Sequence, residues 1–246
     1  MSVLREDASE DERRVLDQEF SDVFLVFDMD PQDSVYDDER LRIAIGFFDD
    51  STGNGKLYLN YPMMQSYRHL RCPFDRDYLH RTVTMDDIRS GYKSLVDKES
   101  YPGIKNVGQY DRTVFLMIIY LNLRKVNRIM NSEDTVPDPE SYLGWDLSVL
   151  LDRQLDLLRT EDSISVVNTS VFNTVDFLTE SILTELAGDG WDVRDCSVGD
   201  DRCRYRSVLS DANGPGRSCD PVQSATTRVT DHRDAGPSPC YAVQMF

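Results

Sequence analysis

The chain has 246 residues, of which 40% are hydrophobic, and its formal net charge at pH 7 is −17. The hydrophobic content is sufficient for the core of one large domain. The charge argues against a protein whose whole surface binds a nucleic-acid backbone, because that mode of binding depends on many Lys and Arg side chains. It does not exclude a nuclease, whose carboxylates bind a metal ion that in turn contacts the phosphate.

Two features of the sequence predict that the protein is neither embedded in a membrane nor secreted. The most apolar run, VFLMIIYLNL at 114–123, has ten residues, whereas a bilayer requires about 20. The N-terminal sequence MSVLREDASEDERR lacks the apolar segment of a secretory signal. We therefore expect a cytoplasmic location and no membrane contact.

Residues 1–19 are predicted to form a polar N-terminal helix, or to be the remnant of a larger element. Ser9 can cap this helix at its N-terminus, and Glu12 completes a capping box. The domain proper is predicted over residues 20–187, with α/β architecture.

The first half of this domain is predicted to be a small parallel sheet. The continuous apolar run at 22–28 predicts a central strand buried on both faces. Helical spacing of apolar residues at 37–50 predicts a helix, STGNG at 51–55 a turn, and 56–62 a second strand. The order strand, helix, strand favours a right-handed crossover between parallel strands.

The second half, residues 86–187, is predicted to be mostly helical. After a helix at 63–70 and a loop at 71–84, we expect helices at 86–97, 111–131, 146–159 and 171–186, and one further strand at 164–170.

Residues 188–246 are predicted to form a disordered tail. From position 193 onwards the chain contains no Lys, no Glu and no Ile, and no apolar period that could form a core. This composition is typical of GC-rich DNA translated in the wrong frame, so we expect a frameshift near residues 188–195. Four of the five cysteines lie here without the spacing of a zinc site, and free thiols are the better interpretation.

Acidic residues directly follow the first predicted strand. Asp28 and Asp30 point to the same side of an extended chain, at the end of the strand where open α/β sheets bind ligands. Both carboxylates can therefore bind one Mg²⁺ (or Mn²⁺) ion, with Asp33 available from the following loop. The alternative is that these aspartates only terminate the strand before Pro31.

Other polar residues are weaker candidates. Lys56 follows STGNG, which lacks the pattern of a phosphate-binding loop, so Lys56 either reaches a phosphate or faces solvent. Tyr58, Tyr61 and Tyr67 lie close together in the sequence and could stack on bases, although Tyr is also a common strand residue. His69 and His80 are candidates for a general base, although most such histidines serve packing or lie on the surface.

Two stretches, VFLVFDMDPQD at 23–33 and GKLYLNYPMMQSYRHL at 55–70, resemble a group of uncharacterised bacterial proteins. Their hallmarks are a strand that ends in D-x-D-P-Q and a later N-Y-P-M-x-E-S motif. That group is similar to the Toprim-like domains of topoisomerases, primases and phage-defence nucleases. The resemblance covers about residues 20–70 and implies a Toprim-like sheet with a metal pair at Asp28 and Asp30. It also implies substrate contacts from Asn60, Tyr61 and Gln65.

The resemblance implies a Mg²⁺-dependent nuclease or phosphoryl-transfer enzyme that acts on nucleic acid, with a protein partner in a phage-defence system. This chain departs from the pattern twice. Gln65 stands where the motif has Glu, and residues 1–21 contain no strand ending in Glu, so we expect that the true start lies upstream or that the element was lost. The alternative is therefore an inactive remnant that keeps the sheet as a binding or structural protein.

The same aspartates also resemble those of haloacid-dehalogenase-type phosphatases. There Asp28 would be the nucleophile and Asp30 the general acid, and SVVNTS at 165–170 is similar to the later hydroxyl motif. That family also has a downstream Lys, whereas the last Lys of this chain is Lys125, and Gln32 replaces the usual Thr or Val.

Overall fold

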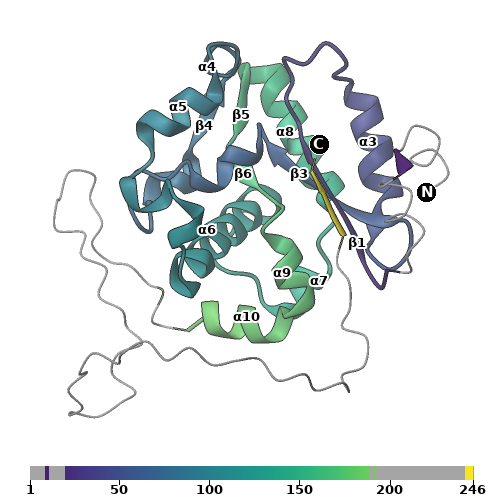
Figure 1. Ribbon diagram of the computed structural model, residues 1–246, viewed down its shortest axis with the longest axis vertical. Coiled ribbons are helices and arrows are strands. Elements are labelled where there is room, and N and C mark those ends of the chain that lie inside the picture. Colours follow the sequence, from purple (N-terminus) through teal and green to yellow (C-terminus); the bar gives the residue numbers. More distant parts are fainter. Residues whose placement is uncertain (1–8, 11–19, 189–190, 192–241, 246) are drawn as a thin grey trace.

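The computed structural model describes residues 9–10, 20–188, 191 and 242–245, and every structural statement below concerns these residues. They form an α/β fold with a mixed sheet and helices around it (Figure 1). The predicted polar helix at 9–20 lies almost entirely outside the described residues. None of the described helices is long and apolar enough to cross a membrane.

The main sheet has β1 (Val23–Asp28) in its interior. β1 pairs in parallel with β3 (Gly55–Tyr61), with Phe24 opposite Lys56 and Asp28 opposite Asn60. This confirms both predicted strands and their parallel pairing. Two very short strands pair antiparallel with β3: β2 (Asp49–Asp50) at its start and β6 (Val167–Asn168) at its end.

Residues 188–246, predicted to be a disordered tail, include a strand. β7 (Ala242–Met245) pairs in parallel with β1 on the side opposite β3. The run YAVQMF at 241–246 contains aromatic residues and the β-branched Val243, which suits an added strand. Apart from 188 and 191, the rest of the predicted tail, with its cysteines and the suspected frameshift, lies outside the described residues.

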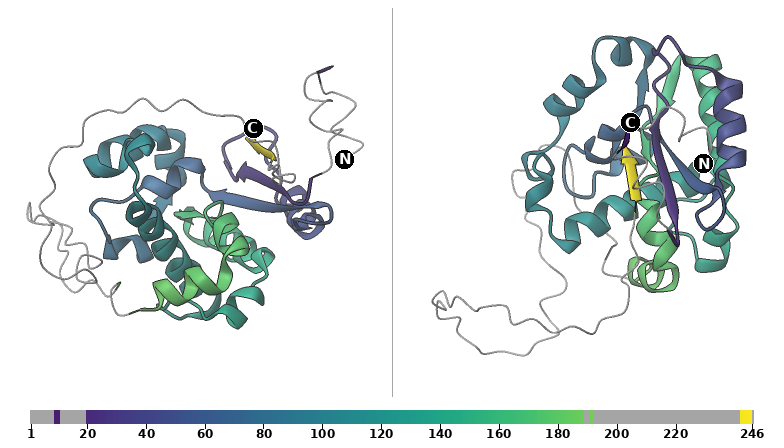
Figure 2. Two further views of the ribbon diagram at one scale, coloured as in Figure 1. Left: turned by 60° about the horizontal axis from the view of Figure 1, so that its bottom comes forward. Right: turned by 45° about the vertical axis from the view of Figure 1, so that its right-hand side comes forward.

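Helix α3 (Asp38–Phe47) makes the connection between β1 and β3. It begins at Asp37, whose side chain accepts a hydrogen bond from the backbone N–H of Arg40. It ends earlier than predicted, because Asp49 and Asp50 enter β2 instead. α3 lies beside α8 (Leu147–Glu161), and the ion pairs Arg42–Asp152 and Arg159–Asp38 join the two helices (Figure 2).

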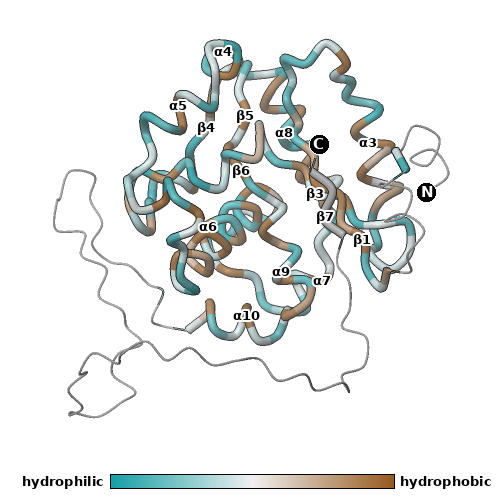
Figure 3. The backbone as a smooth tube through the Cα atoms, viewed as in Figure 1, coloured by the Kyte–Doolittle hydropathy of each residue, from teal (hydrophilic) through white to brown (hydrophobic). Residues whose placement is uncertain are grey.

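The helical half is built around α6 (Arg112–Asn131), which is buried over most of its length. Hydrophobic residues concentrate along α6 and the strands of the main sheet (Figure 3). Around it lie α4 (Met85–Arg89), α5 (Tyr92–Glu99), α7 (Pro139–Leu143), α9 (Phe172–Phe177) and α10 (Thr179–Leu186). Four short 3₁₀ helices complete the set: η1 (Met64–Arg68), η2 (Arg76–His80), η3 (Pro102–Ile104) and η4 (Val107–Gln109).

The helices predicted at 111–131 and 146–159 are confirmed, whereas other elements are shorter than expected. The predicted helix at 86–97 is interrupted at Gly91, which has a φ of 107° and separates α4 from α5. The predicted strand at 164–170 forms two pieces in different sheets, β5 (Ser163–Ser165) and β6. β5 pairs with β4 (Thr82–Thr84), inside the segment expected to be loop.

A buried polar network holds the 71–84 segment against α6. Arg81 forms an ion pair of 2.7 Å with Asp75, and both side chains are almost fully buried. The ammonium group of Lys125 donates to the backbone carbonyls of Tyr78 at 2.8 Å and of Arg81 at 2.6 Å. These contacts explain why a stretch without apolar periodicity is ordered, since they satisfy the carboxylate of Asp75 and two backbone carbonyls of the segment internally.

His69 belongs to the same buried region, and its environment does not suit the predicted general base. Its ring lies 3.2 Å from the hydroxyl of Tyr92 and 3.1 Å from Glu99, and only 1% of the residue is exposed. Burial lowers the pKa of His69 from 6.5 to about 4, against the opposing effect of Glu99. The ring is therefore neutral at pH 7 and serves packing.

This burial predicts a specific loss of stability in acid. Unfolded His69 takes up a proton near pH 6.5 and folded His69 only near pH 4, so the unfolded state binds more protons between these values. Acidification through this window should therefore lower the free energy of unfolding, by on the order of 3 kcal/mol. Urea unfolding at neutral and acid pH measures the effect. His69→Gln should lose this component, and the exposed His80→Gln should keep it. Equal pH dependence in wild type and His69→Gln would contradict the prediction.

Candidate metal site at the strand ends

The carboxyl ends of β1 and β3 lie side by side and continue their contact beyond the strands. The backbone N–H of Met29 donates to the carbonyl of Asn60 at 3.0 Å, and that of Asp30 donates to the carbonyl of Pro62 at 3.1 Å. Asp30 has a φ of 27°, a backbone conformation that non-glycine residues adopt mostly in turns and at functional sites. This conformation comes two residues after Asp28, so the chain turns at the edge where ligands bind in parallel sheets.

Asp30 lies close enough to Asp28 for its charge to disfavour the ionisation of Asp28. Burial raises the pKa of Asp28, and the charge of Asp30 adds to this rise. Hydrogen bonds from the backbone of Met64 and the side chain of Asn60 act in the opposite direction. Burial and the nearby charge of Asp33 likewise raise the pKa of Asp30. A cation between the two carboxylates would remove this repulsion.

One oxygen of this pair lacks a donor. Oδ1 of Asp30 is buried and has no hydrogen-bond partner in the described part of the chain. Gln32 donates to the carboxylate of Asp30 from both backbone and side chain, which orients it. A buried carboxylate oxygen without a donor is energetically unfavourable unless an ion or water satisfies it.

Amide and hydroxyl groups of β3, of β6 and of the residues after β6 complete the edge. Asn60 accepts a hydrogen bond from the backbone N–H of Ser170 at 3.4 Å, and the side chain of Asn168 donates to the carbonyl of Met64 at 3.0 Å. The hydroxyl of Ser170 donates to Asn168 at 2.7 Å. Nothing in the sequence predicts that Met64 belongs to this site. Asn168 and Ser170 are part of SVVNTS at 165–170, which resembles the hydroxyl motif of the phosphatases, but that resemblance predicts no contact with Asn60.

The structure does not bring all predicted ligands together. Asp33 lies in the following turn, where its carboxylate accepts a hydrogen bond from the backbone N–H of Val35 at 3.0 Å. In residues 20–188 and the other described positions, no group of three His, Cys, Asp or Glu side chains is placed to hold a metal ion. The predicted set of Asp28, Asp30 and Asp33 is therefore reduced to the first two, because Asp33 serves a turn.

The four residues predicted to contact the substrate lie in different surroundings, and only some of them are at the strand ends. Asn60 is at the site and fully buried, and Gln65 is half-buried on η1, the element that follows β3. Tyr61 is fully buried, and its ring cannot stack on a base in this conformation. Its predicted role as a base-stacking residue is wrong, because the ring forms part of the hydrophobic core.

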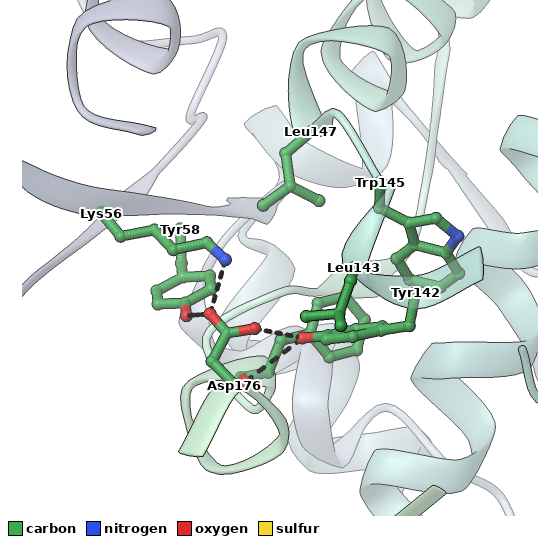
Figure 4. Close-up of a pocket in the computed structure, with 8 residues that line it drawn as sticks. Lys56, Tyr58, Tyr142, Leu143, Trp145, Leu147 and Asp176 are labelled. Atoms are coloured by element: carbon green, nitrogen blue, oxygen red, sulfur yellow. Dashed lines mark hydrogen bonds and ion pairs between the residues drawn. The ribbon is translucent and has the colours of Figure 1, made fainter. Parts of the chain in front are cut away.

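Lys56 belongs to a different site, shown in Figure 4. It lies four residues before Asn60 on β3, which corresponds to about 13 Å along a strand. Its ammonium group forms an ion pair of 2.6 Å with Asp176, which also accepts hydrogen bonds from the hydroxyls of Tyr58 and Tyr142. The predicted phosphate contact is thus replaced by an internal ion pair that joins β3 to α9.

A small pocket of about 60 Å³ opens beside this ion pair. Its walls are largely aromatic, and the residues that line it include Lys56, Tyr58, Tyr142, Trp145, Phe172 and Asp176. Since the carboxylate of Asp176 is already satisfied by three donors, the arrangement is that of a structural contact between the sheet and the helices.

The position of Lys125 does not fit the phosphatase resemblance. The lysine of that family has to reach the substrate phosphate, whereas Lys125 is fully buried and bonded to two backbone carbonyls. Burial lowers its pKa well below 10.5, and Arg81 adds to this effect. No described lysine follows it along the chain.

Comparison with known proteins produced no match: no family model, no curated protein and no solved structure is significantly similar to this chain. The geometry of the strand ends is therefore the basis for a functional assignment.

Proposed function

We propose that this chain is a Toprim-like, Mg²⁺-dependent (or Mn²⁺-dependent) nuclease or phosphoryl-transfer protein that acts on nucleic acid, with Asp28 and Asp30 as the metal ligands. The observation that supports this most directly is the Asp28 and Asp30 pair, with its buried and unpartnered oxygen, at the carboxyl ends of parallel strands. The proposal includes a cytoplasmic location and a protein partner in phage defence, as the resemblance of residues 20–70 implies.

The residues at this edge suit a small hard cation. Mg²⁺ prefers oxygen ligands and often keeps several waters while bound by one or two carboxylates. Asp28 and Asp30 supply that number, and Asn60 holds Asp28 in place by a side-chain hydrogen bond. When bound, the ion would supply the positive charge that binds and polarises a phosphate oxygen.

Ser170 and Gln65, both half-buried, are the polar groups that would contact the substrate. Asn60 and Asn168 are fully buried and hold the edge in place through their internal hydrogen bonds. Gln65 can donate to a phosphate or base but cannot act as an anionic base.

A non-catalytic metal-binding protein is the second candidate. It is favoured by the lack of a third acidic, histidine or cysteine side chain beside the pair in the residues that the structure describes. Both candidates require the cation, so its binding is the first property to test.

Thermal unfolding with and without Mg²⁺ tests cation binding directly. At a concentration ten times Kd, the ion should stabilise the fold by about 1.4 kcal/mol, which corresponds to a rise in Tm of roughly 3–6 °C. In EDTA, Asp28→Asn should raise Tm, because partial desolvation and the charge of Asp30 raise the pKa of Asp28 and so disfavour its ionised form in the folded state. Mg²⁺ should then add nothing to the Tm of that variant.

Asp33→Asn is the matched control, since Asn can still cap the turn and the variant removes a neighbouring charge outside the pair. It should keep the response to Mg²⁺. An identical Mg²⁺ response in wild type and Asp28→Asn would exclude Asp28 as a ligand.

A further inference from the structure

A second pocket, of about 310 Å³, lies between η2, the middle of α6 and Trp191. This volume reaches the range of pockets that bind small molecules. The pocket is formed by elements other than the strand ends with Asp28 and Asp30, and no proposed step uses it.

One wall of this pocket is a cluster of three aromatic rings. The ring centroids of Phe74 and Tyr120 are 6.3 Å apart, and those of Phe74 and Trp191 are 5.7 Å apart. Tyr120 and Trp191 are stacked with a centroid distance of 5.7 Å and an interplanar angle of 30°. Only Tyr120 is buried, so Phe74 and Trp191 keep accessible surface toward the pocket. Such a wall suits a flat aromatic ligand.

The remaining polar lining is basic. Arg76, His80 and Arg124 all line the pocket, and it contains no carboxylate among its lining residues. The guanidinium of Arg124 lies over the ring of Tyr120 at 5.2 Å. It donates to the backbone carbonyl of Asp134 at 2.7 Å and to the hydroxyl of Tyr120 at 3.2 Å, which orients it.

Arg124 differs from most arginines that the structure describes in that no carboxylate pairs with its charge. Within the described residues it has no ion pair, whereas Arg42, Arg71, Arg112 and Arg128 all pair with carboxylates. The chain has a net charge of −17, yet this pocket has two arginines and no acidic residue in its lining, a combination that favours an anionic ligand.

We infer that this pocket binds a nucleotide, with the base against the aromatic wall and the phosphate at Arg124 and His80. Aromatic side chains stack on any base, and an arginine donates in a planar fork to phosphate oxygens. A pocket for a single nucleotide also suits the acidic surface, which disfavours contacts along an extended phosphate backbone. The same chemistry is present in a free nucleotide and at the phosphorylated end of a single strand. The inference goes beyond the proposed function, since it requires neither a metal ion nor Asp28.

Isothermal titration calorimetry of the full chain in EDTA tests this, because the absence of metal separates it from the proposed metal site. Adenosine 5′-monophosphate should bind, whereas adenosine and inorganic phosphate should each bind at least about 10-fold more weakly. Binding should also change the fluorescence of Trp191, one of only two tryptophans in the chain. Absence of nucleotide binding, or equal binding of inorganic phosphate, would overturn the inference.

Two variants and a control locate the site. Arg124→Gln should weaken nucleotide binding about 10- to 100-fold, and Trp191→Leu about 10-fold. His80→Gln, at an exposed position, provides a second loss of a phosphate contact if Arg124→Gln does not fold. Arg128→Gln is the matched control, because Arg128 lies one turn further along α6, pairs with Asp134 and does not line the pocket. Unchanged binding in Arg124→Gln and Trp191→Leu would overturn the inference.

A short single strand with a 5′-phosphate distinguishes the two sources of the ligand. If it binds at least as tightly as the mononucleotide, and Arg124→Gln weakens both, the pocket accepts the end of a nucleic acid. If only the mononucleotide binds, the ligand is a free nucleotide. Either result supports the pocket as a nucleotide site.

Discussion

Replacing Arg81 by methionine is expected to lower the free energy of unfolding by about 3–5 kcal/mol, because it leaves the buried carboxylate of Asp75 without its counter-charge. Asp75 is fully buried, and its remaining donors would be the backbone N–H groups of Arg71 and Asp77. Two backbone amides do not replace a guanidinium in a site that excludes water. For a chain of this length the loss corresponds to a fall in Tm of roughly 6–20 °C.

Urea unfolding followed by circular dichroism measures this change. Arg89→Met is the matched control, because Arg89 forms only an exposed pair with Asp86 and its loss should change stability by less than about 0.5 kcal/mol. The double variant Arg81→Met with Asp75→Leu should recover part of the loss, since it removes the unpaired charge as well. If Arg81→Met unfolded at the same urea concentration as wild type, the ion pair would not contribute to stability.

Replacing Asp28 by alanine is expected to lower the rate of Mg²⁺-dependent cleavage of plasmid DNA or RNA by roughly 10³-fold, which corresponds to about 4 kcal/mol of transition-state stabilisation. The reason is that Asp28 is one of the two carboxylates that, among the residues described by the structure, are proposed to hold the cation. Cleavage assays with Mg²⁺ and with Mn²⁺, at equal concentrations of folded protein, measure the effect.

Asp33→Asn serves as the control in this assay as well and should keep nearly full activity, since Asp33 only caps a turn. Cleavage by wild type that persists in Asp28→Ala would refute Asp28 as a ligand of the reacting site. A wild type that binds Mg²⁺ but cleaves nothing would instead identify the chain as the non-catalytic metal-binding protein.

The strand-end site could be predicted in part because its signal is local. The apolar run of β1 and the two aspartates after it are adjacent in the sequence, and parallel pairing places Asn60 opposite Asp28. The contacts of Asn168 and Ser170 could not be predicted, because β6 has two residues and joins the sheet about 110 residues later in the chain. Strands of this length have too few residues to show a period.

Two other features of the structure that were not predicted do have a recognisable pattern in the sequence. Gly91 interrupts a helical pattern in the segment SGY, which marks the end of α4. Lys125 follows Leu121 by four residues and Ile118 by seven, so it lies on the buried face of α6. By contrast, the ion pair of Lys56 with Asp176 joins residues far apart in the chain and has no local signal.

The burial of Lys125 also has a consequence for chemical reactivity. An amine with a lowered pKa is a good nucleophile, yet complete burial on α6 keeps acylating reagents away from it. Its modification therefore requires that α6 and the 71–84 segment separate, while exposed lysines react in the folded protein. The rate at which Lys125 becomes acylated is thus a direct gauge of how often this part of the molecule opens.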